Sequence, residues 1–373
     1  MNKLVSKWMG SVLLSLGLAG GLVACGGGSA DTVSNPASSA SVASADAVAA
    51  AGVATQATAE SALQPEPLPA EPPLIVRAAA ASRTARSETN ACATIRPFYW
   101  EVGDKIRPLA GGSVKANPAG PGYDAQTVMN IASASKWLYG AYVVERRQGV
   151  LTDEDLRHLN FTSGYTSFPN TACEPTDTVA SCVERADYGV LTPAHVGKFY
   201  YNGGHMQKHA SLPWPGMALG ALDNAGLALE MRRVLGRDIA LSYSQPQLPG
   251  GVRTSAADYG LFLRKLLGGQ LRLGALLGSH AVCTNPATCS DALYSPVDPS
   301  LNWHYSIGHW VEDDPVDGDG AYSSAGAFGF YPWIDVSRTY YGTVARVAVP
   351  GEGAESASCG GLIRQAWISG VAH

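Results

Sequence analysis

The feature that most restricts folding is an abrupt change of composition near Cys92. Residues 26–90 contain no Phe, Tyr, Trp, His or Cys and are dominated by Ala, Ser, Thr, Pro and Gly. Such a stretch cannot bury enough apolar surface to offset the conformational entropy lost on ordering. We therefore predict a flexible tether over residues 25–90 and one folded domain over residues 91–373, which is long enough to bury a sizeable core.

The first residues predict export. Lys3 and Lys7 precede an apolar stretch over residues 8–23, and Leu-Val-Ala-Cys follows at residues 22–25. The stretch is shorter than the ~20 residues of a spanning helix, so a signal peptide over residues 1–24 is favoured. The motif resembles the lipobox of bacterial lipoproteins. That resemblance implies a lipid anchor on Cys25 and an outer-membrane lipoprotein facing the periplasm or the exterior.

The remaining cysteines predict disulfides. Six of the seven are left once Cys25 is set aside, an even number in an oxidising compartment. Six cysteines allow many pairings, and we prefer those that close short local loops first. The predicted pairs are Cys173 with Cys182, Cys283 with Cys289 and, as the remainder, Cys92 with Cys359.

Charge and spacing exclude several function classes. The formal charge is -5 and no run of Lys or Arg occurs, which argues against nucleic acid or an anionic membrane surface as the main partner. No Cys-x-x-Cys or Cys/His cluster has the spacing of metal ligands. We predict no metal and no cofactor, and contact with a membrane only through the lipid anchor.

Local patterns predict a strand pair, a helical middle, further strands and a last helix. This order is typical of an α+β domain with an antiparallel sheet. The expected strands cover residues 98–102, 112–114, 305–311, 322–331 and 340–348. The expected helices cover residues 133–148, 193–201, 217–235, 258–267 and 360–371.

The tetrad Ser133-Ala134-Ser135-Lys136 stands where an extended segment turns into an apolar helix. Residues three apart share a helix face, so Ser133 and Lys136 lie side by side. A lysine desolvated in an apolar pocket has a lowered pKa and can accept the proton of the serine. The pattern also occurs by chance, with the serine as a helix cap and the lysine on the surface.

Further motifs make residues 97–371 similar to serine β-lactamases, penicillin-binding proteins and related esterases. These families carry Ser-x-x-Lys at a helix start, then a turn and helix, then a Gly-containing strand end beside the nucleophile. In class C β-lactamases and the related esterases, a Tyr-x-Asn motif lies between the first element and the turn. The matches, in chain order, are Ser133 to Lys136, Tyr200 to Asn202, residues 249–258 and residues 324–327. The resemblance implies an antiparallel sheet flanked by terminal helices, with a helical subdomain.

The resemblance also implies roles for individual residues. Ser133 is the acylated nucleophile, Lys136 its proton partner and Tyr200 a base or relay. Asn202 orients the substrate or Lys136. The third motif supplies Ser324, Gly326 and Ala327, and the backbone amides of Ser133 and Ala327 form the oxyanion hole.

One departure concerns substrate choice. β-Lactamases and penicillin-binding proteins place Lys or His at the start of the third motif to hold a substrate carboxylate, whereas Ser324 stands here. The sequence therefore favours a carboxylesterase or amidase that forms an acyl-enzyme on a small-molecule or oligomeric substrate. The alternatives are a penicillin-binding D,D-peptidase or β-lactamase, and a cell-surface lipoprotein that binds without catalysis. We place His205 and His209 on a polar surface, because a metalloprotease Glu is missing between them.

Overall fold

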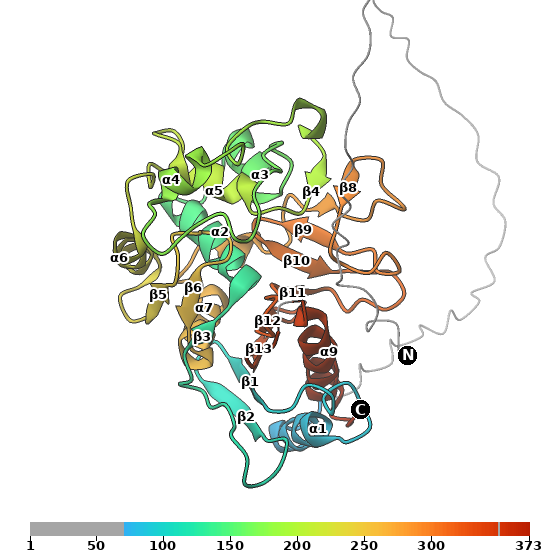
Figure 1. Cartoon of the computed structure of the whole chain (residues 1–373). Coiled ribbons are helices and arrows are strands. Elements are labelled where there is room, and N and C mark those ends of the chain that lie inside the picture. The colour runs from blue at the N-terminus through green and yellow to red at the C-terminus, as the bar shows by residue number, and fades with distance from the viewer. Residues whose placement is uncertain (1–70, 350) are drawn as a thin grey trace, which may run out of the picture. The chain divides into compact units, whose positions relative to one another are not determined.

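The computed structural model describes residues 71–349 and 351–373, so the predicted signal peptide, Cys25 and most of the tether lie outside the described residues. The end of the predicted tether is wrong, because helix α1 covers Leu74–Arg86. Its Ala80, Ala81 and Ala85 are fully buried, and α1 packs beside α9 (Gly353–Ser369; Figure 1). Small alanine side chains let two helices approach closely, so this segment buries a face without any aromatic residue.

An eight-stranded sheet forms the centre of the described domain (Figure 1). Its order is β2-β1-β13-β12-β11-β10-β9-β7, and every neighbouring pair is antiparallel. The predicted α+β class with an antiparallel sheet is confirmed. The strands are β1 (Phe98–Asp104), β2 (Pro108–Val114), β7 (Val282–Cys283), β9 (His304–Ser306), β10 (His309–Glu312), β11 (Ala321–Ser323), β12 (Tyr331–Ile334) and β13 (Tyr340–Ala345).

Helices cover both faces of this sheet. Tyr331 and Trp333 of β12 point to the face covered by α1 and α9. Ile334 and Tyr341 point to the other face, toward α2 (Ser135–Arg146) and α7 (Ala256–Leu267). This alternation along each strand divides the core into two clusters. The predicted terminal helices on the sheet are therefore confirmed.

The helical subdomain contains α3 (Asp153–Leu159), α4 (Val179–Glu184), α5 (Gly204–Ser211) and α6 (Asn224–Leu235), and α8 (Leu273–Leu276) follows α7. Two small sheets join the subdomain to the rest. One contains β3 (Met129–Asn130), β6 (Val252–Thr254) and β5 (Leu241–Tyr243), and the other pairs β4 (Phe199–Tyr200) with β8 (Ala292–Tyr294) in parallel. None of the helices in the described ranges has the length and hydropathy needed to traverse a bilayer.

Two predicted helices are wrong in part. Residues 193–201 form a short 3-10 turn, η2 (Pro193–His195), followed by β4, because Gly197 has a φ of 80° that no helix continues through. The helix predicted from residue 217 begins only at Asn224. There the side chain of Asp223 accepts a hydrogen bond from the Gly226 amide at 2.8 Å and caps the first turn.

The late strands are shorter than predicted. Residues 305–311 form a hairpin of β9 and β10, because Ile307 and Gly308 both have positive φ, 42° and 82°. Two such residues make the tight turn that suits the twist of antiparallel strands. Residues 322–331 likewise divide into β11 and the start of β12. The loop between them carries the third motif.

All three predicted disulfides are present: Cys92–Cys359, Cys173–Cys182 and Cys283–Cys289. Cys92 and Cys359 are separated by 267 residues in sequence, yet their Cα atoms are 4.7 Å apart and both side chains are fully buried. This bond joins the segment after α1 to the middle of α9. The first and last segments of the domain are thus covalently linked.

Replacing Cys92 and Cys359 together by serine is expected to lower the free energy of unfolding by about 3 kcal/mol, because the long loop is no longer closed in the unfolded chain. Urea unfolding of the oxidised proteins measures this change. The matched control replaces Cys283 and Cys289, whose loop spans only 6 residues, and should cost less. Equal losses in the two double variants would contradict the loop argument.

Candidate active site

Ser133 lies in a strained turn between a strand and a helix. The amide of Ile131 donates to the Val252 carbonyl at 3.1 Å, which extends the β3–β6 pairing up to η1 (Ala132–Ala134) and α2. Ala132 has a φ of 44°, a region that residues with a Cβ rarely adopt. Such strain concentrates at functional sites. The turn leaves Ser133 half-buried at the start of α2.

Lys136 is buried beside the Ser133 hydroxyl, as predicted from the tetrad. Only 5% of Lys136 is exposed, and its Nζ donates to Ser133 Oγ at 2.9 Å and to the Pro249 carbonyl at 2.8 Å. Burial lowers the pKa of Lys136 to about 7. An amine with this pKa is substantially neutral near pH 7, so it can accept a proton from serine.

The Pro249 carbonyl is placed by the turn that the sequence matched between the second and third motifs. Gln207 of α5 holds this turn, because its Oε1 accepts from the Leu248 amide at 3.0 Å and its Nε2 donates to the Pro246 carbonyl at 2.8 Å. Gly251 is required there, since an added Cβ would overlap the Gln245 carbonyl. A backbone oxygen thereby orients Lys136.

The tyrosine beside this pair is Tyr201. Its ring centroid lies 5.2 Å from Lys136 Nζ, and the Trp310 ring stacks on it at 5.3 Å. Burial raises the pKa of Tyr201 to about 12, and hydrogen bonding to the Ser133 side chain opposes that rise. Tyr201 therefore stays protonated near pH 7 and interacts with both Ser133 and Lys136.

The prediction that Tyr200 faces Ser133 is contradicted. The Tyr200 ring stacks on His195 at 5.2 Å and lies 5.3 Å from the ring of Tyr294, which is 44% exposed. Successive side chains of an extended segment point to opposite sides. Tyr201 therefore shares the inward side with Phe199, and Tyr200 points away from it.

Asn202 makes no hydrogen bond to Lys136 or Ser133, so it does not orient Lys136, and its alternative contact with the substrate stays a prediction. Its Nδ2 donates to the Phe168 carbonyl at 3.1 Å, and its Oδ1 accepts from the amides of Phe168 and Gly204 at 3.3 and 2.8 Å. These bonds fasten the loop at Phe168 to the start of α5. The Pro249 carbonyl, and not Asn202, supplies the second contact of Lys136.

The third motif lies against Ser133, as predicted. Ser324 is buried, and its Oγ donates to the Ser133 carbonyl at 3.1 Å. Gly326 passes so close to Ile131 that an added Cβ would overlap the Ile131 carbonyl. Only glycine allows this approach of the two backbones. Ala327 follows at the end of this segment.

Two backbone amides fit the predicted oxyanion hole. Neither Ser133 nor Ala327 donates its amide to an acceptor within residues 71–349 and 351–373, whereas the Gly326 amide donates to the Phe330 carbonyl at 2.8 Å. The Ala327 carbonyl accepts from the Gly351 amide at 3.1 Å, which fixes the orientation of this peptide. Amides held without a protein acceptor suit a developing negative charge.

His205 and His209 are buried, so their predicted surface position is wrong. His205 hydrogen bonds Ser163 at 2.8 Å and the Tyr200 carbonyl at 3.0 Å. His209 hydrogen bonds Tyr139 at 3.0 Å and Asp155 at 3.0 Å. Both nitrogens of each ring are used in packing the subdomain. No cluster of metal-ligating side chains occurs in the part of the chain that the structure describes.

Sequence reasoning missed Tyr201 and the Pro249 carbonyl, and it favoured a core position for Trp310. The signal for Tyr201 was present in the pair Tyr200-Tyr201, since only one of two successive side chains can face the core. The strand that carries Trp310 was also expected. A backbone carbonyl leaves no trace in residue type, so the contact of Lys136 with Pro249 required the fold.

Comparisons with known proteins bear on the fold. No protein-family model matches the chain, and no curated protein matches it. The domain is similar to the solved structure of EstCE1, a hydrolase with promiscuous acyltransferase activity, at 15% identity over 79% of this chain and 98% of that one, with a TM-score of 0.54. A D-stereospecific amidohydrolase from Streptomyces matches at 11% identity over 81% and 100% of the two chains, with a TM-score of 0.52.

The octameric penicillin-binding protein homologue from Pyrococcus abyssi also matches. Its identity to this chain is 12%, the match covers 75% of this chain and 74% of that one, and the TM-score is 0.53. At such identities the likeness shows the fold, and it agrees with the predicted arrangement of sheet, terminal helices and helical subdomain. The described domain thus shares the fold of these two hydrolases and of the penicillin-binding-protein homologue.

Proposed function

We propose that this protein is a serine hydrolase that cleaves an ester or amide bond through an acyl-enzyme on Ser133. The observation that carries the proposal is the contact of Ser133 Oγ with a buried Lys136 whose pKa is lowered to about 7. A structural surface lysine would be solvated and charged. Solved structures with the same fold include a hydrolase and an amidohydrolase, which supports this choice.

In the proposed reaction, neutral Lys136 takes the Ser133 proton while Oγ attacks the substrate carbonyl carbon. The amides of Ser133 and Ala327 stabilise the oxyanion. Because the pKa of Tyr201 is about 12, its hydroxyl serves as a relay that passes a proton from Lys136 to the leaving group. Water then attacks the acyl-enzyme, releases the acid and returns the proton to Ser133.

The substrate class we propose is a small or oligomeric ester or amide without a carboxylate beside the scissile bond. Ser324 is uncharged and already donates to the Ser133 carbonyl, so it cannot pair with a carboxylate as a lysine would. A β-lactam or a D-Ala-D-Ala terminus needs such a partner. The β-lactamase and D,D-peptidase alternatives therefore become outcomes of the test.

The test is intact-mass labelling of residues 71–373 with a fluorophosphonate and, separately, with a penicillin. We expect the fluorophosphonate alone to add one adduct, and Ser133→Ala to abolish it. A penicillin adduct on Ser133 would favour the peptidase or β-lactamase alternative. The absence of any adduct that depends on Ser133 would favour a binding protein without catalysis.

The two adjacent tyrosines offer a matched pair of variants. Tyr201→Phe is expected to lower kcat by about 100-fold, because it removes the hydroxyl beside Ser133. Tyr200→Phe should change kcat by less than about threefold, because its ring packs outside the site. Steady-state hydrolysis of a p-nitrophenyl ester measures both. A larger loss of kcat in Tyr200→Phe than in Tyr201→Phe would instead support Tyr200 as the base or relay.

We further propose that the full chain is a lipoprotein anchored through Cys25 in the outer membrane. The support is the apolar stretch with its Leu-Val-Ala-Cys motif. Full-length protein expressed in a Gram-negative host should sediment with outer membranes and carry a lipid mass on Cys25, while Cys25→Ser should remain unmodified. An unlipidated wild-type chain recovered from the periplasm would contradict the anchor.

A further inference from the structure

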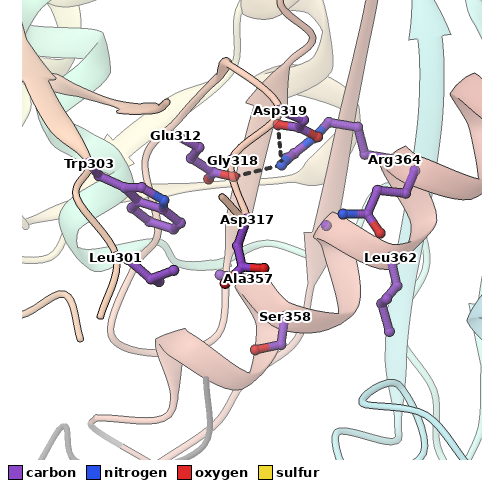
Figure 2. A pocket seen from close by; sticks show the side chains of 12 residues that line it. Leu301, Trp303, Glu312, Asp317, Gly318, Asp319, Ala357, Ser358, Leu362 and Arg364 are labelled. Carbon is purple, nitrogen blue, oxygen red and sulfur yellow. Dashed lines mark hydrogen bonds and ion pairs between the residues drawn. The ribbon is translucent and has the colours of Figure 1, made fainter. Parts of the chain in front are cut away.

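A pocket opens between the β10–β11 loop and the middle turns of α9. Its cavity volume is about 110 Å³, which is smaller than a site for a whole drug-sized ligand and suits a single small substituent. Figure 2 shows Leu301 and Trp303 on one wall and Ala357 of α9 on the other, with the Asp317 carboxylate between Leu301 and α9. The pocket thus combines an aromatic wall with a carboxylate.

The pocket adjoins the candidate active site along one face of β10. Trp310 and Glu312 are two residues apart, so their side chains lie on the same face about 7 Å from each other. Trp310 stacks on Tyr201, and Glu312 lines the pocket. The Trp303 ring lies 6.3 Å from the Trp310 ring and belongs to the pocket wall. The buried Trp310 side chain therefore contacts Tyr201 of the candidate active site and Trp303 of the pocket wall.

The α9 side of the pocket contains a glycine that helix packing does not require. An added Cβ at Gly361 would meet nothing within 4 Å, whereas one at Gly360 would overlap the Tyr331 ring. Glycine inside a helix costs about 1 kcal/mol relative to alanine. Gly361 is one of the residues that line the pocket. A larger side chain at this position would fill it without disturbing the sheet.

The charges of the pocket favour a cation. Arg364 donates to Glu312 at 2.6 Å and to Asp319 at 2.7 and 3.0 Å, so one guanidinium is shared by two carboxylates. The carboxylate of Asp317 has no hydrogen bond or ion pair to any residue in the described ranges and lines the pocket. Three carboxylates and one guanidinium leave a formal charge of -2 on the lining.

We propose that this pocket binds an alkylammonium group carried by the substrate. The indole of Trp303 offers the face over which an ammonium cation is attracted, and Asp317 offers the neutralising charge. An anionic substituent would meet the negative lining. This inference rests on the proposed hydrolase function and narrows its substrates to esters or amides with a cationic substituent.

The experiment compares two p-nitrophenyl esters of equal chain length, one ending in a methyl group and one in a trimethylammonium group, over a series of lengths. For at least one length we expect the wild-type kcat/KM to favour the ammonium ester. Asp317→Asn should lower kcat/KM for that ester by about fivefold and leave the methyl ester unchanged. Gly361→Leu should lower kcat/KM for the ammonium ester by about tenfold.

The matched control is Asp313→Asn. This exposed carboxylate lies in the same loop and pairs with His304 at 2.9 Å, outside the pocket. The substitution changes the net charge equally and should leave both esters unaffected. An equal effect of Asp313→Asn and Asp317→Asn, or equal rates for the two esters at every length, would overturn the proposal.

A binding measurement separates this inference from the proposed function. Butyltrimethylammonium is titrated calorimetrically into Ser133→Ala, with and without Gly361→Leu. Binding that Gly361→Leu abolishes would support the pocket even if no ester is hydrolysed. No binding to the Ser133→Ala protein would overturn the pocket assignment even if neutral esters are hydrolysed through Ser133.

Discussion

Ser133→Ala is expected to lower kcat/KM for a p-nitrophenyl ester by at least about 10⁴-fold, because no other group in the arrangement can form the acyl-enzyme. The fold should persist, since Ser133 Oγ makes its contact with Lys136 and carries no packing role in the core. The far-ultraviolet circular dichroism and the unfolding midpoint of the variant should match those of the wild type.

The tetrad itself supplies the control for this prediction. Ser135 is fully buried, and its Oγ accepts a hydrogen bond from the Val252 amide at 3.3 Å. Ser135→Ala should therefore cost a little stability, about 1 kcal/mol, and leave kcat within a few fold of the wild type. If both alanine variants lost activity equally, the loss would reflect local structure and Ser133 would not be the nucleophile.

Lys136→Met is expected to lower kcat by about 10³-fold, because it removes the base that accepts the Ser133 proton while keeping an apolar side chain of similar length. In the wild type, kcat/KM should decline on the acid side of its pH profile with an apparent pKa near 7. Burial lowers the pKa of Lys136 to about this value. Activity should fall as pH drops below 7, because protonated Lys136 cannot accept a proton.

The same variant should be more stable than the wild type. Lys136 has a pKa of about 7 when folded and 10.5 as a free side chain, so between these values the folded state binds fewer protons. The free energy of unfolding of the wild type therefore rises with pH across this window, and that of Lys136→Met does not. At pH 7 we expect the free energy of unfolding of Lys136→Met to exceed that of the wild type by about 2 kcal/mol. By pH 10 this difference should be smaller.

Urea unfolding at the two pH values measures this difference. A wild-type stability that stays flat from pH 7 to 10 would show that Lys136 keeps an ordinary pKa. It would then be charged at neutral pH and unsuited to act as the base. If Lys136→Met loses activity and gains stability, Lys136 is present for its role in the reaction and not for the stability of the fold.

Sequence patterns predicted the architecture because its determinants are local. The tetrad, the turn at residues 249–251 and the strand alternation are all visible as residue types at fixed spacing. Even the pairing of Cys92 with Cys359 followed by elimination once the short loops were closed. The end of the tether was misjudged because an alanine face gains its burial only from the partner helix, which a composition argument does not see.

The site was predicted less completely for a related reason. Ser133, Lys136, Ser324 and Gly326 are placed by backbone geometry that their motifs encode. Choosing between Tyr200 and Tyr201 depends on how β4 pairs with β8, and that pairing brings together residues far apart in the chain. The motif spacing alone therefore selected Tyr200, whereas in the folded domain Tyr201 faces Lys136.

The position of β13 has a consequence for biogenesis. This strand lies between β1 and β12, so the hairpin of β1 and β2 joins the rest of the sheet only through the last strand to be synthesised. A polypeptide truncated before Tyr340 would expose two unpaired strand edges, at β1 and β12, and would lack α9 over the core. Unpaired edges invite aggregation and degradation. The topology thus provides quality control: products truncated before this strand cannot reach the native state, and only chains that contain it should accumulate as folded protein.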